Sequence, residues 1–265
     1  MNSNVDIIYH GWSCFSVCWG ETTMLFDPFY RPMHGASWAS LQDFTKVKLI
    51  CVTHGHYEHY LDTAPVAQKT GATVISSKMV CDHLKRKYKM DSKNLIAIDP
   101  MQRVEVLGFK ITAFQWHHRY ISFYKFFKGN FVTALQFAYH GLLRAPFSAP
   151  ALGYHIEGPD GIRLMNYNEG FSNLVDITEL EQYSTKFKPD ILIAGMQLNF
   201  EEYLGRGVGA LKPKVIVLFH PHEKLFEKFK LQSSSPETFV SRIKQYVPNA
   251  RICLPQPMER INVVP

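Results

Sequence analysis

The segment Thr53-His54-Gly55-His56-Tyr57-Glu58-His59 places three histidines and one carboxylate within six consecutive residues. It directly follows the apolar run 47–52, which is typical of a buried strand. A loop held by the carboxyl end of a strand is where an α/β protein can bring several side chains to one point. Neutral imidazoles and a carboxylate are suitable ligands for zinc, iron or manganese. The spacing therefore predicts a metal site on this loop.

Histidine or glutamate also follows apolar runs at three later places in the chain. His117 and His118 come after residues 109–116, and His220 comes directly after residues 215–219. Glu169 follows a further strand-like segment. Each of these positions alone would be an ordinary polar residue at the end of a strand. Four strand ends that all offer histidine or glutamate predict a single converging site.

The elements that must position these residues alternate along the chain. Strand-like segments are 5–9, 14–19, 23–26, 47–52, 72–75, 95–98, a hairpin over 104–114, 152–157, 162–167, 191–194, 215–219 and 251–254. Helical patterns cover 64–70, 77–88, a stretch between 194 and 215, and 236–246. Two strand-rich halves, each with helices, predict two sheets covered by helices rather than one doubly wound sheet. Without a linker or low-complexity tract, residues 1–265 are expected to form one domain.

Composition sets limits on the class of protein. An apolar share of 46% and a charged share of 20% are ordinary for a globular protein. No apolar stretch reaches the ~18 residues of a transmembrane segment, and residues 1–6 lack the features of a secretory signal. The five cysteines are scattered without a Cys-x-x-Cys pair, which favours a reducing cytoplasm. The net charge of +6 permits an anionic substrate or surface, but the basic run 85–89 is more typical of a solvated helix face than of a nucleic-acid patch.

Residues 119–150 do not follow the alternation of strands and helices. This insertion carries nine Phe and Tyr residues interspersed with lysine and arginine, and a helical form is expected for it. Three roles remain open: an extra packing layer or a surface for homo-oligomer formation, a lid over the active site that accepts a hydrophobic substrate, or a membrane interface.

In order and spacing, these motifs resemble the metallo-β-lactamase superfamily, and in particular its lactonase-like and N-acyl phosphatidylethanolamine phospholipase D-like branch. The segments Tyr9-His10-Gly11-Trp12-Ser13-Cys14-Phe15 and Leu25-Phe26-Asp27-Pro28 also look like the first strands of that branch. The resemblance covers nearly the whole chain except the insertion. It implies an αββα sandwich of two mixed β-sheets flanked by helices, with a two-metal site at one edge.

The resemblance also implies a role for each candidate residue, around two divalent metal ions that would be zinc, with iron and manganese as alternatives. The first metal would be held by His54, His56 and His117. The second would be held by Glu58, His59 and His220, with Glu169 bridging the two. His118 is the substitute for His117, because neighbouring residues of a strand point to opposite faces. Asp27 would orient a ligand imidazole, Arg119 would pair with a substrate phosphate or carboxylate, and the pocket would be lined by His10, Tyr57, His118 and His222.

Glu58 and Glu169 depart from the family pattern, which has aspartate at both positions. Each glutamate adds one methylene, about 1.3 Å of reach, whereas metal–ligand distances tolerate only about ±0.2 Å. Because both acids differ and every expected histidine is present, we interpret the changes as a joint adjustment of the site.

The resemblance implies a hydrolase that cleaves an ester, lactone, amide or phosphodiester bond through a hydroxide bridging two metals, with Glu58 as a possible base. The small-molecule substrate would be hydrophobic or lipid-like and anionic. Two alternatives stay open. Glutamate-rich histidine sites also suit a dinuclear iron oxidase or oxygenase, and a non-catalytic metal-binding protein is the third interpretation.

Overall fold

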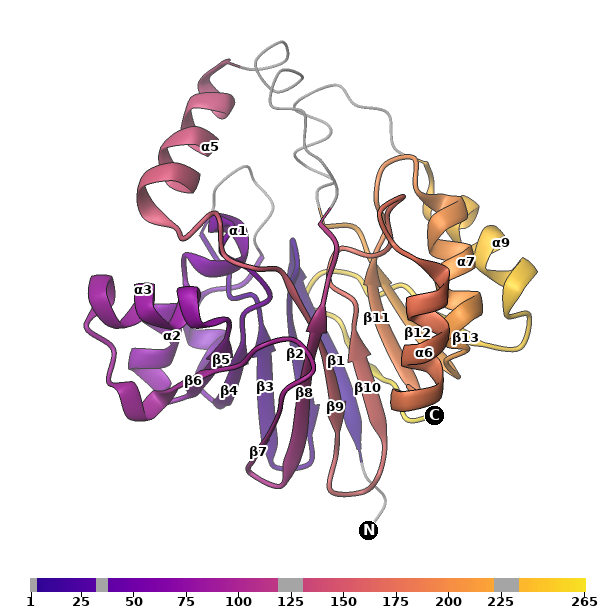
Figure 1. Ribbon diagram of the computed structural model, residues 1–265, viewed down its shortest axis with the longest axis horizontal. Coiled ribbons are helices and arrows are strands. Elements are labelled where there is room, and N and C mark those ends of the chain that lie inside the picture. Colours follow the sequence, from indigo (N-terminus) through magenta and orange to yellow (C-terminus); the bar gives the residue numbers. More distant parts are fainter. Residues whose placement is uncertain (1–3, 32–37, 119–130, 222–233) are drawn as a thin grey trace.

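Two seven-stranded sheets pack face to face, and helices cover the outer face of each (Figure 1). This arrangement comes from a computed structural model, which describes residues 4–31, 38–118, 131–221 and 234–265. It confirms the predicted αββα sandwich of two mixed β-sheets flanked by helices.

The two sheets have the same internal pattern. In spatial order the first contains β14 (Arg260–Asn262), β1 (Val5–Gly11), β2 (Cys14–Trp19), β3 (Thr22–Phe26), β4 (Val47–Cys51), β5 (Thr73–Ser76) and β6 (Leu95–Ala97). The second contains β13 (Arg251–Cys253), β12 (Val215–Phe219), β11 (Ile191–Gly195), β10 (Arg163–Asn166), β9 (Leu152–Glu157), β8 (Phe109–Gln115) and β7 (Arg103–Val106). Pairing is antiparallel from β14 to β3 and from β7 to β10, and parallel over β3–β6 and β10–β13. Parallel strands present their carboxyl ends at one edge.

The helices form two outer layers (Figure 1). The layer on the first sheet consists of α1 (Tyr57–Tyr60), α2 (Thr63–Thr70) and α3 (Lys78–Tyr88), with the 3₁₀ turns η2 (Leu41–Phe44) and η3 (Ser92–Asn94). The layer on the second sheet consists of α6 (Ile177–Phe187), α7 (Glu201–Leu211) and α9 (Pro236–Tyr246). Helix α5 (Phe131–Arg144) stands apart above α1 and confirms the helical form expected for that part of the insertion. None of the described helices is long and apolar enough to cross a bilayer.

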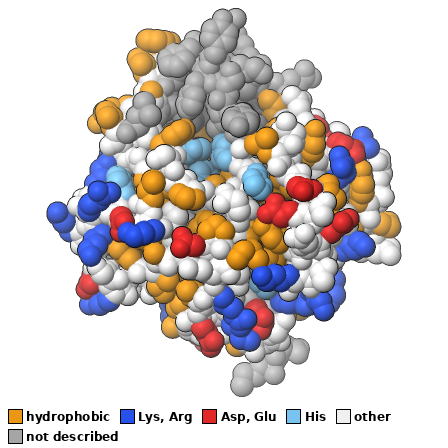
Figure 2. Space-filling view, in the orientation of Figure 1, with side chains coloured by type: hydrophobic (Ala, Val, Ile, Leu, Met, Phe, Trp, Pro, Cys, Tyr) orange, Lys and Arg blue, Asp and Glu red, His pale blue; other side chains and the backbone are white. Residues whose placement is uncertain are grey.

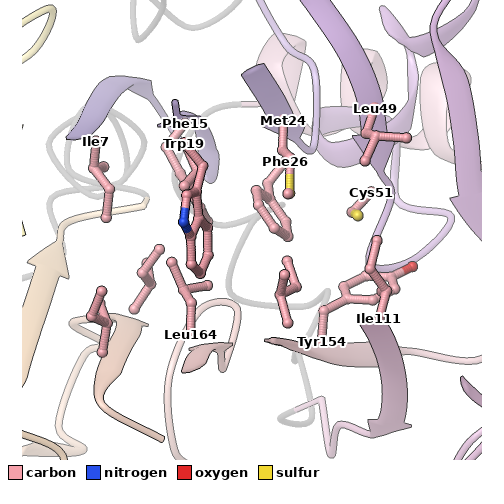
Figure 3. Close-up of a cluster of buried hydrophobic side chains, with 14 of the residues drawn as sticks. Ile7, Phe15, Trp19, Met24, Phe26, Leu49, Cys51, Ile111, Tyr154 and Leu164 are labelled. Atoms are coloured by element: carbon pink, nitrogen blue, oxygen red, sulfur yellow. The ribbon is translucent and has the colours of Figure 1, made fainter. Parts of the chain in front are cut away.

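The main core lies between the two sheets. Side chains such as Phe15 and Phe26 point from the first sheet toward Tyr154 and Leu164 of the second (Figure 3). Phe15 and Phe26 stack with ring centroids 4.8 Å apart. Complete burial of one such side chain stabilises the fold by roughly 1.5–3 kcal/mol. Two further clusters fix each sheet to its own helices, so both faces of both sheets are apolar.

Tyr154 of β9 joins the two sheets next to the edge where β4 ends. Its buried hydroxyl donates a hydrogen bond to the carbonyl oxygen of Val52 over 2.7 Å. Two residues earlier in β9, the backbone N–H of Leu152 donates to the carbonyl oxygen of Thr53 over 2.8 Å. The second sheet therefore holds the start of the histidine-rich loop in place.

Candidate metal centre

Several of the predicted site residues lie at the edge of the sandwich where the strands end. Asp27 follows β3, His54 follows β4, His118 follows β8 and Glu169 follows β10. Figure 2 shows histidine side chains gathered on this edge, below the residues drawn in grey. Helix α1 begins directly after His56. Glu58 and His59 therefore lie in a short helix, whereas the sequence had suggested a loop.

Three histidines form a group suited to one metal ion. One ring nitrogen each from His54, His56 and His118 lies within 4.8 Å of the other two. The ring centroids of His54 and His118 are 5.3 Å apart, and those of His56 and His118 are 4.6 Å apart. The group unites the loop of the first sheet with a strand end of the second.

The hydrogen bonds of His54 fix which of its nitrogens can bind metal. Thr53 Oγ1 donates its only proton to the Asp27 carboxylate over 2.7 Å. His54 Nδ1 lies 3.0 Å from that oxygen, and the Nδ1–H tautomer supplies the proton for this contact. The lone pair is left on Nε2, which is buried and has no hydrogen-bond partner among the described residues. Such an orphaned buried acceptor beside two more imidazoles fits a metal ligand.

Electrostatics keep His54 neutral. Burial lowers its pKa well below the ordinary value of 6.5, and the neighbouring imidazoles of His59, His56 and His118 lower it further. Only a neutral imidazole has a lone pair for a metal, so the environment favours the binding form.

His117 and His118 point in different directions. His117 Nε2 lies 3.2 Å from Glu179 Oε2 of α6, away from the histidine group. His118 instead packs edge-on against Trp116, with ring centroids 5.1 Å apart, and faces His54. The structure thus brings His118 into the group of three, where the expectation from sequence had put His117 first. The cause is the alternation of an extended chain, which places residues 116 and 118 on one side and 117 on the other.

Asp27, His59 and Glu169 form a buried chain beside the three histidines. Asp27 Oδ2 accepts from His59 Nδ1 over 2.8 Å, and His59 Nε2 lies 3.0 Å from Glu169 Oε1. Burial alone would lower the pKa of His59, but the two carboxylates outweigh it and raise that pKa to about 10. Asp27 also accepts from the backbone N–H of Thr53 over 2.7 Å, so the same carboxylate contacts the loop and the His59 imidazole.

The loop that carries Glu169 packs closely against the backbone at the end of β11. Gly170 has φ +100°, and a Cβ there would collide with the carbonyl oxygen of Gly195 at the end of β11. Gln197, two residues farther on, donates from Nε2 to Glu169 Oε2 over 2.8 Å. The same carboxylate oxygen is 4.0 Å from His118 Nε2. Glu169 therefore links His59 to the group of three.

Two other predicted ligands, Glu58 and His220, do not join this group. Glu58 is buried in α1, with Oε1 4.0 Å from His56 Nδ1. His220 is half-buried at the end of β12, and its carbonyl oxygen accepts from the Tyr9 hydroxyl over 3.1 Å. In the described part of the chain, the ligand atoms of His54, His56 and His118 all lie within 4.8 Å of one another. Among the same described residues, the donors expected for a second metal do not form a group that is equally close.

The predicted pocket residues are spread over different surroundings. His10 is buried against Phe44, with Nε2 2.7 Å from Ser16 Oγ, and burial lowers its pKa to about 4. Tyr57 is buried between Phe29 and His140, with ring centroids 6.1 and 5.7 Å away. Neither is placed against the three histidines by these contacts. Arg119 and His222 lie outside the described residues.

Several supporting residues had not been singled out from sequence. They contact the predicted ligands directly and are Thr53, Trp116, Phe147, Asn168 and Gln197. Phe147 stacks on the His56 ring with a centroid distance of 4.5 Å. Trp116 is fixed by donation from Nε1 to the carbonyl oxygen of Gly170 over 3.0 Å. The sequence feature that could have pointed to them is their position, because most of them follow the ends of apolar strands.

Gly55 provides a test of how tightly the loop is packed. A Cβ at this position would lie far inside contact distance of the Pro146 carbonyl group, which is backbone and cannot rotate away. We expect Gly55→Ala to displace His54 or His56 and to weaken metal binding by about 10–100-fold, as loss of supporting contacts does elsewhere. Gly141→Ala is the control, since its Cβ would meet Phe147 at an ordinary 3.6 Å. Equal metal affinity of the two variants in a chelator competition would contradict the tight packing.

The family described as "Beta-lactamase superfamily domain" matches residues 22–159. A metal-dependent hydrolase of family UPF0173 from Thermoplasma volcanium is 37% identical over 112 residues, 42% of this chain and 46% of that protein. The chain therefore spans less than half of that relative's length. Igni18, a metallo hydrolase from Ignicoccus hospitalis, gives a TM-score of 0.72 at 18% identity over 98% of this chain and 99% of that one. CmlA, a diiron β-hydroxylase from Streptomyces venezuelae, gives 0.63 at 13% identity over 98% and 54%.

At these low identities the two solved structures establish likeness of fold alone. The family match, in contrast, covers more than half of the chain and includes β3, the histidine-rich loop and the strand that ends before His118. Together with the two-sheet sandwich, it shows that the chain belongs to the β-lactamase superfamily domain family.

Proposed function

We propose that this protein is a metal-dependent hydrolase whose metal is held by His54, His56 and His118. The observation that carries the proposal is the convergence of three ring nitrogens within 4.8 Å, one of them a buried and neutral Nε2 of His54 without a hydrogen-bond partner among the described residues. The relative named as a metal-dependent hydrolase supports the same reaction class.

A bound divalent metal would supply a water of lowered pKa and polarise the bond to be cleaved. The chain's own residues prepare the site for it. Asp27 holds Thr53 and His59, and Thr53 in turn holds His54 in the tautomer with its lone pair on Nε2. Glu58, buried 4.0 Å from His56, is the carboxylate that we propose to accept the proton released in hydrolysis.

The second metal of a dinuclear centre is the finer part of the proposal. Its ligands would be Glu58, His59, Glu169 and His220, and in that case Glu58 would hold this metal instead of accepting the proton. For this, His59 would have to release the Nε2 proton that its carboxylate neighbours stabilise and give up its 3.0 Å contact with Glu169 Oε1. Its bond to Asp27 would stay in place as the orienting interaction. Metal analysis of the purified protein tests it directly, because a dinuclear centre requires about two ions per chain and the three-histidine group alone requires one.

The substrate is proposed to carry a bulky apolar group. A cavity of about 370 Å³ has His220 and Met196 in its wall, and Met196 directly precedes Gln197, the residue that holds Glu169. Most of the other described lining residues are apolar, among them Trp12, Trp38 and Phe219. The described lining includes one carboxylate, Glu237, and no lysine or arginine, so it favours an uncharged group over an anionic one.

The test is hydrolysis of matched substrates by zinc- or manganese-loaded protein. We expect cleavage of an ester, a lactone or a phosphodiester. Each substrate is tested as a pair, with and without an aromatic substituent, and the aromatic member should be cleaved faster. Activity should be lost in His54→Ala and should fail to return when metal is restored. Full activity of a chelator-treated protein, or of His54→Ala, would disprove the proposal.

Iron-dependent oxidation is the second candidate. It is favoured by Glu169, whose Oε2 lies 4.0 Å from His118 Nε2, because imidazoles with an adjoining carboxylate suit iron. CmlA, described as a diiron β-hydroxylase, shares the fold. Protein that holds iron and consumes oxygen only with a reductant would select this candidate over hydrolysis. The cytoplasmic location and the homo-oligomer stay predictions.

A further inference from the structure

Helix α5 presents an apolar stripe to solvent. Val132, Leu135, Tyr139 and Leu143 are 64%, 49%, 55% and 69% exposed. Their spacing of three, four and four residues places them along one face of the helix. The outer helices α3 and α6 have the opposite arrangement and bury most of their apolar residues against a sheet. Figure 2 shows hydrophobic side chains over the position of α5 in Figure 1.

The stripe is not a frayed end, because other parts of α5 are fixed to the protein. The His140 ring lies 5.7 Å from that of Tyr57, and Gly141 is buried. At the carboxyl end of the helix, Lys87 Nζ donates to the carbonyl oxygens of Leu143 and Arg144 over 3.1 and 3.0 Å. The helix is therefore held from one side while its apolar stripe faces outward.

Cations border the stripe at its carboxyl end. The last turn of α3 carries Lys85, Arg86 and Lys87, all exposed, and Lys89 follows it. The bonds from Lys87 to the carbonyl oxygens of Leu143 and Arg144 hold this end of α3 beside the end of α5. In Figure 2 lysine and arginine side chains lie below the apolar patch of α5. An outward apolar stripe beside a cationic cluster has the chemistry of a helix that lies in the interface of an anionic bilayer.

We propose that the face formed by Val132, Leu135, Tyr139, Leu143 and the basic end of α3 docks on an anionic lipid surface. A second copy of the chain fits this face less well, because it would present the same apolar and cationic side chains and so offer the cluster no opposite charge. A bilayer rich in phosphatidylserine would accept the apolar side chains and attract the cations at the same time. The proposal does not rest on the proposed hydrolysis.

The experiment is co-sedimentation of the purified full chain with vesicles, without any substrate. The probes are phosphatidylcholine vesicles and vesicles in which about a quarter of the lipid is phosphatidylserine. We expect binding to the anionic vesicles at least about tenfold stronger than to the neutral ones, and weakened by added salt.

Two double variants separate the contributions of the stripe and the cations. Leu135→Ser with Leu143→Ser should weaken binding to both kinds of vesicle by at least about tenfold, since buried apolar area is lost. Lys85→Gln with Arg86→Gln should remove the preference for anionic lipid, and Lys87 is retained because it holds α5. Leu107→Ser is the matched control, a 56% exposed leucine in the β7–β8 turn at the opposite end of the sandwich.

Circular dichroism and metal content of every variant must match the parent protein, so that a loss of binding reports on the surface. Unchanged sedimentation of the leucine double variant would overturn the proposal. So would a lipid-independent dimer in sedimentation velocity that the same variant abolishes, because that result assigns the face to a second copy of the chain.

Discussion

His118→Ala is expected to lower metal affinity by more than about 100-fold, whereas His117→Ala should leave metal content unchanged. The two residues are neighbours, but only His118 has its ring nitrogen within 4.8 Å of those of His54 and His56. His117 is bonded to Glu179 of α6 instead. Removing a direct ligand should lower metal affinity more than removing a residue that supports a ligand, which usually lowers it by about 10–100-fold. Metal content after dialysis against a chelator measures the difference.

The pair serves as its own control, since both variants remove an imidazole from the same strand end. Loss of metal in His117→Ala as well would contradict the contact of His117 with α6, because it would make His117 a ligand. Glu179→Ala adds a second check. It removes the partner of His117, together with the acceptor of the Tyr183 hydroxyl, and should leave metal binding intact. Loss of metal in that variant would make α6 part of the site's support.

Asp27→Ala is expected to lower the free energy of unfolding by about 3–5 kcal/mol, the cost of breaking a buried ion pair. Asp27 accepts hydrogen bonds from the Thr53 backbone, the Thr53 hydroxyl and His59, and all of these groups are buried. Alanine leaves these donors without an acceptor and releases the tautomer of His54. Metal affinity should fall by about 10–100-fold in parallel. Chemical denaturation and chelator competition provide the two measurements.

Asp82→Ala is the matched control for this loss of a carboxylate. Asp82 pairs with Lys78 on the exposed face of α3, where screening by solvent leaves an ion pair little net contribution to stability. A drop of similar size in both variants would show that Asp27 stabilises the fold no more than a surface acid does. A large loss of stability with unchanged metal affinity would separate its structural role from its role in the site.

The sequence predicted most strands closely because their environment is simple. β2, β9, β12 and α9 begin and end where the apolar patterns do. β12 illustrates the reason, since all five of its residues are buried between two apolar layers, and such a strand is a continuous apolar run. Helix α6 was not predicted. Only Leu180, Tyr183 and Phe187 of its residues are buried, too sparse a pattern to stand out in a polar segment.

The sequence by itself determined the donor set and its attachment to strand ends, because residue type sets ligand chemistry and an apolar run marks the strand before it. Tertiary structure decided which donors meet. Both faces of β8 are covered by apolar layers. The sequence therefore could not show whether His117 or His118, just after β8, faces the histidine-rich loop. The contact of Trp116 with His118 and His54 settles that side and turns His117 toward α6. The buried bonds that prepare His54 and His59 likewise join residues far apart in the chain, and only the packing of the two sheets brings them within reach.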